Sequence, residues 1–206
     1  MSLLMPWLGV MFPLVFSPGP ANIVFAACGA QLGVRRSLPF LVGVDTVFLL
    51  QSLVVGFGLA QVVARYPYLV PLLQLAGAAY LVYLASGFLR SGSSAQPDAR
   101  PALGFVEGVT IQTLNGKGWL LVVLMFSLFG EAARSQFGAA GTLVLVAWLA
   151  VLNVAMHLVW IKAGALLARL GSGQRFARNQ NRLYGTCLLL VAVWLIVDND
   201  LWPLSL

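Results

Sequence analysis

The residues that could do chemistry in this sequence interrupt two long apolar stretches. The first interruption is Ser17-Pro18-Gly19-Pro20, with Asn22 after it, and the second is Asn115-Gly116-Lys117-Gly118. Proline lacks a backbone N–H and clashes with the preceding helical turn, and glycine adds backbone freedom, so a regular helix is not expected to continue through either stretch. Each break would expose a half-helix N-terminus, whose free N–H groups and positive dipole end attract anions.

These two half-helix N-termini predict a binding site for a small carboxylate. The free amides would come from residues 21–23 and 117–119, Lys117 would add a cation, and the side chains of Asn22 and Asn115 would add neutral hydrogen-bonding groups. A proline kink packed against neighbouring helices is the alternative for the first break, and a structural salt bridge is the alternative for Lys117. The predicted substrate-binding residues are Pro18, Gly19, Pro20, Asn22, Asn115, Gly116 and Lys117.

Asp45 and His157 are the candidates for ion coupling. Asp45 lies within an apolar run, and a carboxylate there is costly unless it faces the interior of a helix bundle or water. Its alternatives are an ion pair with Lys117 and an interfacial position. His157 is the one histidine of the chain and shares a helix face with Asn153, four residues earlier. It could relay protons near neutral pH, and the alternative is a buried histidine with a satisfied hydrogen bond.

The composition identifies the elements that must position these residues. Of the 206 residues, 60% are hydrophobic and 9% are charged, whereas a soluble domain carries roughly 25% charged residues. This excludes a soluble enzyme, a disordered chain and a disulfide scaffold, and it favours an all-α membrane protein. Six apolar segments are predicted to span the membrane, at about residues 7–30, 38–63, 69–89, 105–130, 139–166 and 183–200.

The six segments divide into two halves of three. The first half is residues 1–90, a cytoplasmic linker follows at 91–104, and the second half is residues 105–206. Because three is odd, the second half enters the membrane from the opposite side, so the two halves would be inverted three-helix repeats. The two interruptions fall at corresponding places, in spans one and four, and this predicts six transmembrane helices of which the first and the fourth are broken.

The arginines between the apolar segments set the predicted orientation. Eight lie on one side and two on the other, and the positive-inside rule puts the larger group in the cytoplasm and both termini outside. This topology accounts for the net charge of +6 without a nucleic-acid partner. The N-terminus lacks the features of a signal peptide and is predicted to begin the first span. The larger group is Arg35, Arg36, Arg90, Arg100, Arg169, Arg175, Arg178 and Arg182, and the smaller group is Arg65 and Arg134.

No known catalytic or cofactor-binding motif occurs in the sequence. There is no GxSxG, HExxH or GxxxxGK[ST] stretch and no Cys/His cluster. Cys28 and Cys187 lie in apolar runs and are expected to be packing residues. We therefore expect neither an enzyme, nor a cofactor, nor a metal site. The alternatives to an exporter of amino-acid-like solutes are an exporter of another small solute or a metal ion, a membrane thiol-redox protein, and a scaffold that transports nothing.

Four motifs resemble the LysE/RhtB family of amino-acid exporters. They are the stretch from Ser17 to Asn22 with the turn Gly33-Val34-Arg35-Arg36, Gly43-Val44-Asp45, residues 77–84 (GAAYLVYL), and residues 105–108 leading to Asn115-Gly116-Lys117. The family usually has proline where this chain has Gly116, and glycine permits a break without enforcing it.

The resemblance implies a function and partners. It implies a secondary transporter, driven by the proton-motive force, that exports amino acids or their derivatives across a bacterial cytoplasmic (inner) membrane. The implied partners are the amino-acid-like substrate and membrane lipid. Helix faces rich in small and aromatic residues are compatible with a homodimer.

Overall fold

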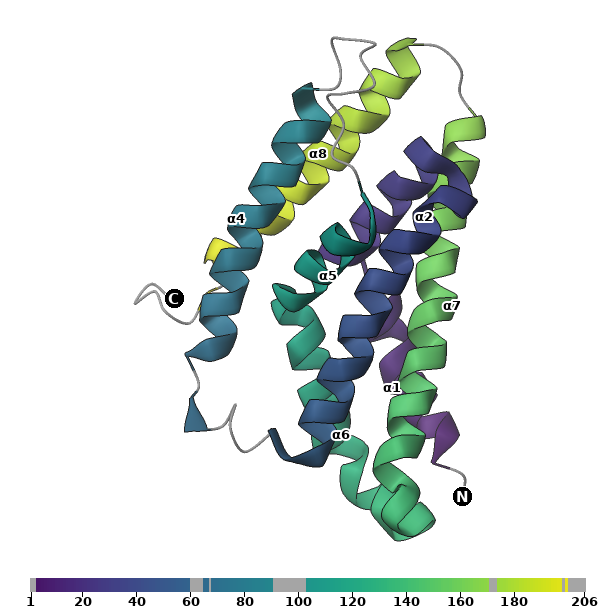
Figure 1. Cartoon of the computed structure of the whole chain (residues 1–206), viewed down its shortest axis with the longest axis vertical. Helices are drawn as coiled ribbons and strands as arrows, with labels where there is room; N and C mark the ends of the chain where they lie inside the picture. Colours follow the sequence, from purple (N-terminus) through teal and green to yellow (C-terminus); the bar gives the residue numbers. More distant parts are fainter. Residues whose placement is uncertain are drawn as a thin grey trace.

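The chain forms a bundle of helices, as the composition predicts (Figure 1). The computed structural model describes residues 3–59, 65–66, 68–90, 103–170, 174–197 and 199, and regular structure in these ranges is entirely helical. Most of the predicted linker lies outside the described residues. The α-helices are α1 (Leu4–Phe16), α2 (Pro20–Val54), α4 (Leu69–Arg90), α5 (Phe105–Thr113), α6 (Gly116–Phe137), α7 (Gly141–Arg169) and α8 (Gln174–Val197); a π-helix, η1 (Val55–Leu59), and a 3-10 helix, η3 (Gly138–Ala140), join them.

Two glycines turn the chain back within long apolar segments. Among the described residues, three helical segments are long and apolar enough to cross a membrane, namely Pro20–Gly58, Gly116–Arg169 and Arg178–Val197. The first contains Gly33 at φ 72° and the second contains Gly138 at φ 60°, a backbone region that other residues rarely adopt. Gly33 divides α2 into a first arm, residues 20–32, and a second arm, residues 34–54.

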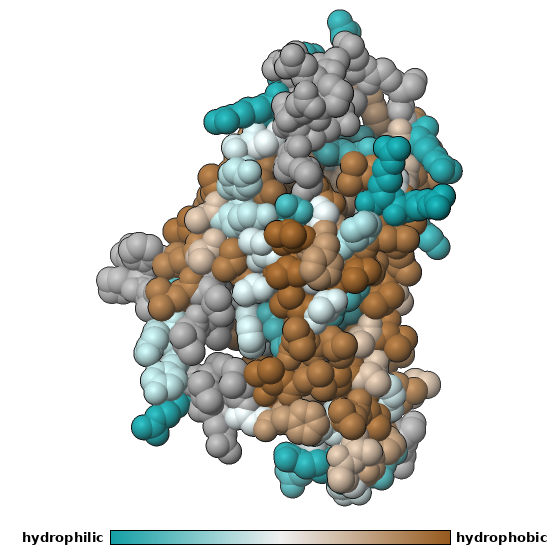
Figure 2. Space-filling view, viewed as in Figure 1, coloured by the Kyte–Doolittle hydropathy of each residue, from teal (hydrophilic) through white to brown (hydrophobic). Residues whose placement is uncertain are grey.

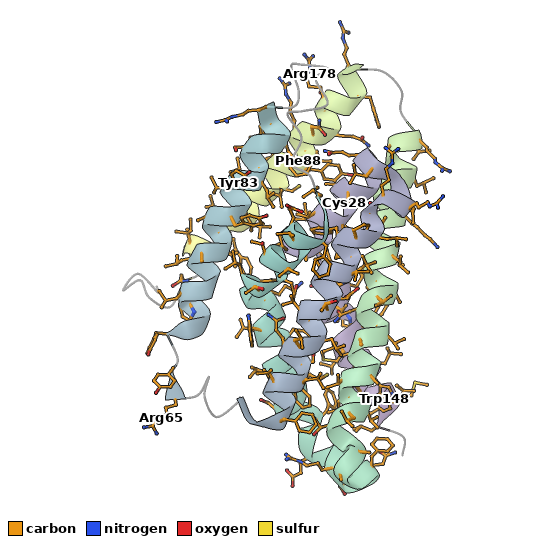
Figure 3. The ribbon with its side chains drawn as sticks, in the orientation of Figure 1. Cys28, Arg65, Tyr83, Phe88, Trp148 and Arg178 are labelled. Atoms are coloured by element: carbon orange, nitrogen blue, oxygen red, sulfur yellow. The ribbon has the colours of Figure 1, made fainter. Side chains whose placement is uncertain are left out.

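The surface of the bundle is that of a membrane protein. Hydrophobic residues cover the middle of the visible face, and the most hydrophilic residues gather towards its upper and lower ends (Figure 2). Arg178 and Arg65, which the sequence assigns to opposite sides of the membrane, lie at opposite ends of the molecule (Figure 3). The arrangement fits a helical bundle whose apolar waist lies in hydrocarbon.

Glycines let the backbones of the central helices approach closely. α2 packs chiefly on α7 and α5, and α4 packs chiefly on α8. A Cβ on Gly29 or on Gly164 would overlap the backbone of the facing helix, at Ile161 and Ala26 respectively. The second arm of α2 meets α5 in the same way. Small residues of this kind allow van der Waals packing between membrane helices, where the hydrophobic effect contributes little.

The buried apolar residues form two clusters, and the polar residues lie where the clusters meet. The upper cluster is built around Phe25, Phe40, Phe88, Ile111 and Ile161. The lower cluster is built around Trp7, Met11, Phe48, Leu121, Met125 and Leu149. Each broken helix contributes to the lower cluster on one side of its break and to the upper cluster on the other. The breaks are therefore held in place by packing above and below them.

We expect Gly164→Ala to destabilise the protein, because the added methyl group would push α7 away from the first arm of α2. Overpacking of this kind costs roughly 1–3 kcal/mol. The measurement is the melting temperature of the purified protein in detergent. Gly9→Ala is the control, since a Cβ at Gly9 meets nothing within 4 Å and alanine favours helix. A Gly164→Ala protein as stable as the wild type would show that the close approach is unimportant.

Candidate functional site

The first break separates α1 from α2 at residues 17–19. α1 ends at Phe16, and α2 begins at Pro20, which stands at the first helical position, where its missing N–H has no consequence. Gly19 precedes this helix in an extended conformation, with φ −154° and ψ 177°. The break predicted from the two prolines is present.

The carbonyl groups of residues 14–17, the last before α2, would be orphaned by this break, and side chains from the break itself, α2 and α7 satisfy them. In a continuous helix they would bond to amides that the two prolines lack or that the break displaces. Each of the last four accepts a hydrogen bond from a side chain instead. Leu14 accepts from the Ser17 hydroxyl (2.8 Å), Val15 and Ser17 accept from the Asn22 amide (2.9 and 3.0 Å), and Phe16 accepts from the Trp160 indole (3.3 Å).

The second break is also present, at a place where the sequence has glycine and no proline. α5 ends at Thr113, and α6 begins at Gly116 with Asn115 as its N-cap. The Asn115 side-chain oxygen accepts a hydrogen bond from the Gly118 amide at 3.3 Å. The irregular residues are thus Leu114 and Asn115, slightly before the predicted position, and Gly116 already belongs to the following helix.

The two half-helix N-termini differ in how many amides they leave free. At the first, the Ile23 amide bonds to the Gly19 carbonyl, no side chain caps the helix, and no partner is seen for the amides of Ala21 and Asn22 among the described residues. At the second, the amides of Gly118 and Trp119 both bond to Asn115. Only the Lys117 amide remains of the three predicted there, so the first N-terminus leaves more amides free than the second.

Lys117 joins the two breaks. Its Nζ donates to the Ser17 carbonyl oxygen at 3.1 Å and to the Ser17 hydroxyl at 2.7 Å. Across the described chain, no carboxylate lies within ion-pair distance of this ammonium group, so the alternative of a salt bridge with Asp45 is wrong. A Cβ at Gly19 would come within 3.1 Å of the lysine Cδ and Nζ, and glycine therefore leaves the lysine room to lie across the break.

Asp45 instead pairs with His157. Nδ1 of the histidine lies 2.9 Å from Oδ1 of the aspartate, and their side chains are 6% and 16% exposed. Phe25 stacks on the imidazole with a ring separation of 4.3 Å. Within the described ranges, Oδ2 of Asp45 and Nδ2 of Asn153 have no hydrogen-bond partner. Polar atoms buried without a partner are costly, so a hydrogen-bonding ligand or a water molecule would be favoured beside them.

A small cavity brings most of the predicted residues together. It has a volume of about 40 Å³ and reaches from the breaks to α7. This is room for water but far less than the roughly 300–1,000 Å³ of ordinary ligand pockets, so a substrate requires the site to widen. Pro18 and Gly116 do not line it. Asp45 does not line it either, but it is hydrogen-bonded to His157, which does. The predicted residues that do line it are Gly19, Pro20, Asn22, Asn115, Lys117 and His157, together with Asn153.

Two buried glutamines belong to this site and were not predicted. Gln112 donates to the Gln51 side-chain oxygen at 2.8 Å, and Gln51 donates back to the Gln112 carbonyl at 3.1 Å. Asn115 donates to the Gln112 side-chain oxygen at 3.1 Å, so the second break is tied to the second arm of α2. Their presence inside apolar runs was a signal that they face the bundle interior.

The described residues were also compared with what a metal site or a thiol site would need. No group of three or more His, Cys, Asp and Glu residues that could hold a metal ion occurs in the described ranges. Cys28 is buried, Cys187 is partly buried, and both are free.

Broken helices that meet at a polar cavity in an apolar bundle are typical of membrane transporters. Comparison with known proteins identifies the family: residues 12–199 match the LysE type translocator family, and the chain therefore belongs to it. It is 27% identical over 186 residues to a cysteine/O-acetylserine efflux protein of Klebsiella pneumoniae subsp. pneumoniae, covering 88% of this chain and 91% of that protein. The cysteine/O-acetylserine efflux protein of Escherichia coli strain K12 is 28% identical over 187 residues, covering 86% and 89%. No solved structure matches the chain significantly.

We expect Asn22→Ala to destabilise the first break. The Val15 carbonyl would lose its side-chain donor, and a buried acceptor left unsatisfied costs roughly 1–3 kcal/mol. The melting temperature in detergent measures this loss. Thr113→Val is the control, because that exposed hydroxyl bonds only within its own helix. Equal melting temperatures for Asn22→Ala and the wild type would mean that the break does not need the asparagine.

Proposed function

We propose that this translocator exports amino acids or amino-acid derivatives, and that the two breaks bind the carboxylate of the substrate. One observation carries the proposal: a lysine ammonium group, which among the described residues is bound only by neutral oxygens of Ser17, lies in the cavity onto which the uncapped start of α2 opens. A cation in an apolar bundle is costly without a counter-charge. The names of the curated relatives, cysteine/O-acetylserine efflux proteins, support a substrate of this class.

The carboxylate would displace Ser17 from Lys117. It would then accept hydrogen bonds from the lysine and from the free amides of Ala21 and Asn22, with the dipole of α2 adding a favourable field. When no substrate is bound, Ser17 keeps the ammonium group hydrogen-bonded between the breaks. The site therefore exchanges one set of lysine hydrogen-bond acceptors for another, and the positive charge gains a counter-charge only when the substrate binds.

We propose that export is coupled to the proton-motive force through Asp45 and His157. Imidazole exchanges protons readily near neutral pH. His157 lines the cavity, and its hydrogen bond to Asp45 connects the second arm of α2 to α7. A proton taken up by this pair changes the charge of the cavity wall and the strength of the link between the two helices. Substrate and proton would thereby act on the same helices from neighbouring positions.

The proposed architecture is two inverted three-helix repeats, residues 1–90 and 105–206, on either side of the linker. Spans one to three are α1 with the first arm of α2, the second arm, and α4. Spans four to six are α5 with α6, α7, and α8. Each repeat then begins with a broken span. An inner-membrane location with both termini outside follows from the arginine distribution, and the homodimer stays a prediction from the helix faces.

We expect Lys117→Met to reduce export by at least tenfold, because the neutral side chain keeps the length of lysine but cannot bind a carboxylate. The measurement is efflux of cysteine, alanine and leucine from proteoliposomes. Lys162→Met is the matched control, since this exposed residue of α7 is the other lysine of the chain. Export by Lys117→Met at the wild-type rate would contradict the carboxylate-binding role.

We expect Asp45→Asn to uncouple export from the pH gradient. Efflux down a substrate gradient should continue, but an imposed pH gradient should no longer accelerate it, because the amide cannot take up a proton. Efflux is measured with and without that gradient. Glu131→Gln is the control, as Glu131 is an exposed carboxylate of α6 away from the cavity. A response to pH in Asp45→Asn that equals the wild-type response would remove the aspartate from coupling.

A further inference from the structure

A second hollow adjoins the polar cavity at Lys117. It is a groove of about 460 Å³ between α1, α6 and α8. Three residues, Leu14, Lys117 and Leu121, line both the groove and the polar cavity. The groove has the size of an ordinary small-molecule site, which the polar cavity alone lacks. Lys117 therefore stands between a polar compartment and a much larger apolar one.

The wall of the groove offers almost no polar group. Its lining is leucine, valine and tryptophan apart from Lys117 and Ser127. The Ser127 hydroxyl donates to the Val123 carbonyl at 2.9 Å and is satisfied within its own helix. Leu120 is 49% exposed and Trp194 is 55% exposed, so the groove is open on its outer side. In a bilayer that side would meet lipid tails, where a charged group is strongly disfavoured.

The charge of Lys117 decides what kind of molecule suits both compartments. Its ammonium group has no acidic partner among the described residues, and it marks the polar end of the groove. The complementary ligand carries a carboxylate at one end and an apolar part at the other. An amino acid meets this description only when its side chain is apolar, because a charged side chain would be placed against the leucines and the lipid.

We propose that the groove receives the side chain of the exported amino acid, and that this chain prefers substrates with apolar side chains. The carboxylate lies at Lys117 and the α2 N-terminus, and the side chain lies along Leu120, Leu124 and Trp194. This inference rests on the proposed function and adds a substrate class to it. Burial of each additional methylene of the side chain favours binding by roughly threefold to fourfold.

The test is a ladder of substrates that differ only in side-chain length. Proteoliposomes holding the purified full chain are loaded with alanine, 2-aminobutyrate, norvaline and norleucine at equal, low concentrations, and efflux is followed by mass spectrometry. We expect the relative efflux rate to rise by about threefold with each methylene. Aspartate and lysine, loaded in parallel, should leave more slowly than alanine.

Variants of α6 connect this preference to the groove. Leu124→Ala should lower the norleucine-to-alanine efflux ratio by threefold or more, because the shortened residue removes part of the apolar wall that a long side chain would contact. Leu128→Ala is the matched control: it is also an exposed leucine of α6, but it does not line the groove. If Leu124→Ala does not fold, Ser127→Leu tests the same point, since a larger side chain in the groove should obstruct long substrates and lower the same norleucine-to-alanine efflux ratio.

The outcomes separate this proposal from the proposed function. Equal efflux of all four amino acids would overturn the groove proposal while the exporter stands. An unchanged preference for norleucine in Leu124→Ala would overturn it as well. If Ser127→Leu is used in place of that variant, the same result there would overturn it. Hexanoate, which lacks the amino group, is the last probe. If its protein-dependent efflux, taken as the excess over protein-free liposomes, is faster than that of norleucine, the groove accepts amphipathic anions in general, and the assignment to amino-acid side chains is overturned. Failure to export cysteine or any member of the ladder would overturn the proposed function itself.

Discussion

The structure depends on one constraint: carbonyl groups freed by a helix break inside an apolar bundle must find donors. In water, solvent would supply them, but hydrocarbon cannot. At the first break the donors are the side chains of Ser17, Asn22, Trp160 and Lys117. These come from the break itself, α2, α7 and α6. Satisfying the carbonyls therefore fixes the relative positions of these helices, and the site and its cation are placed by the same hydrogen bonds.

The polar groups form a layer between two apolar clusters. On the second arm of α2, Asp45 stands between Val44 of the upper cluster and Phe48 of the lower one. On α7, His157 stands between Leu152 of the lower cluster and Ile161 of the upper one. Apolar packing on both sides keeps the layer shielded, so its electrostatic interactions are stronger than they would be in water. Rearrangement of the packing around the breaks would widen the cavity and change these interactions together.

Much of the site could be predicted from the sequence, because the features involved are local. Pro18 and Pro20 stop a helix wherever the chain places them, and the first break lies where they put it. Gln51 and Gln112 were missed, since an isolated glutamine in an apolar run says little until its partner is known. The partner of Asp45 could not be predicted either: the sequence offers an ion pair with Lys117 as an alternative, whereas the structure pairs Asp45 with His157, 112 residues further along the chain.

The sequence by itself determined that this is a helical membrane protein, where its first helix breaks, and that Asn22, Asn115 and Lys117 lie at or next to the breaks. Each of these follows from the composition of a short stretch. The tertiary structure alone decided which residues meet. Gly33 turns α2 back, and Gly29 and Gly164 let α2 approach α7 closely, so that Asp45 reaches His157. The pairing of Lys117 with Ser17 and the apolar groove beside it arise from contacts among separate helices, which no local pattern encodes.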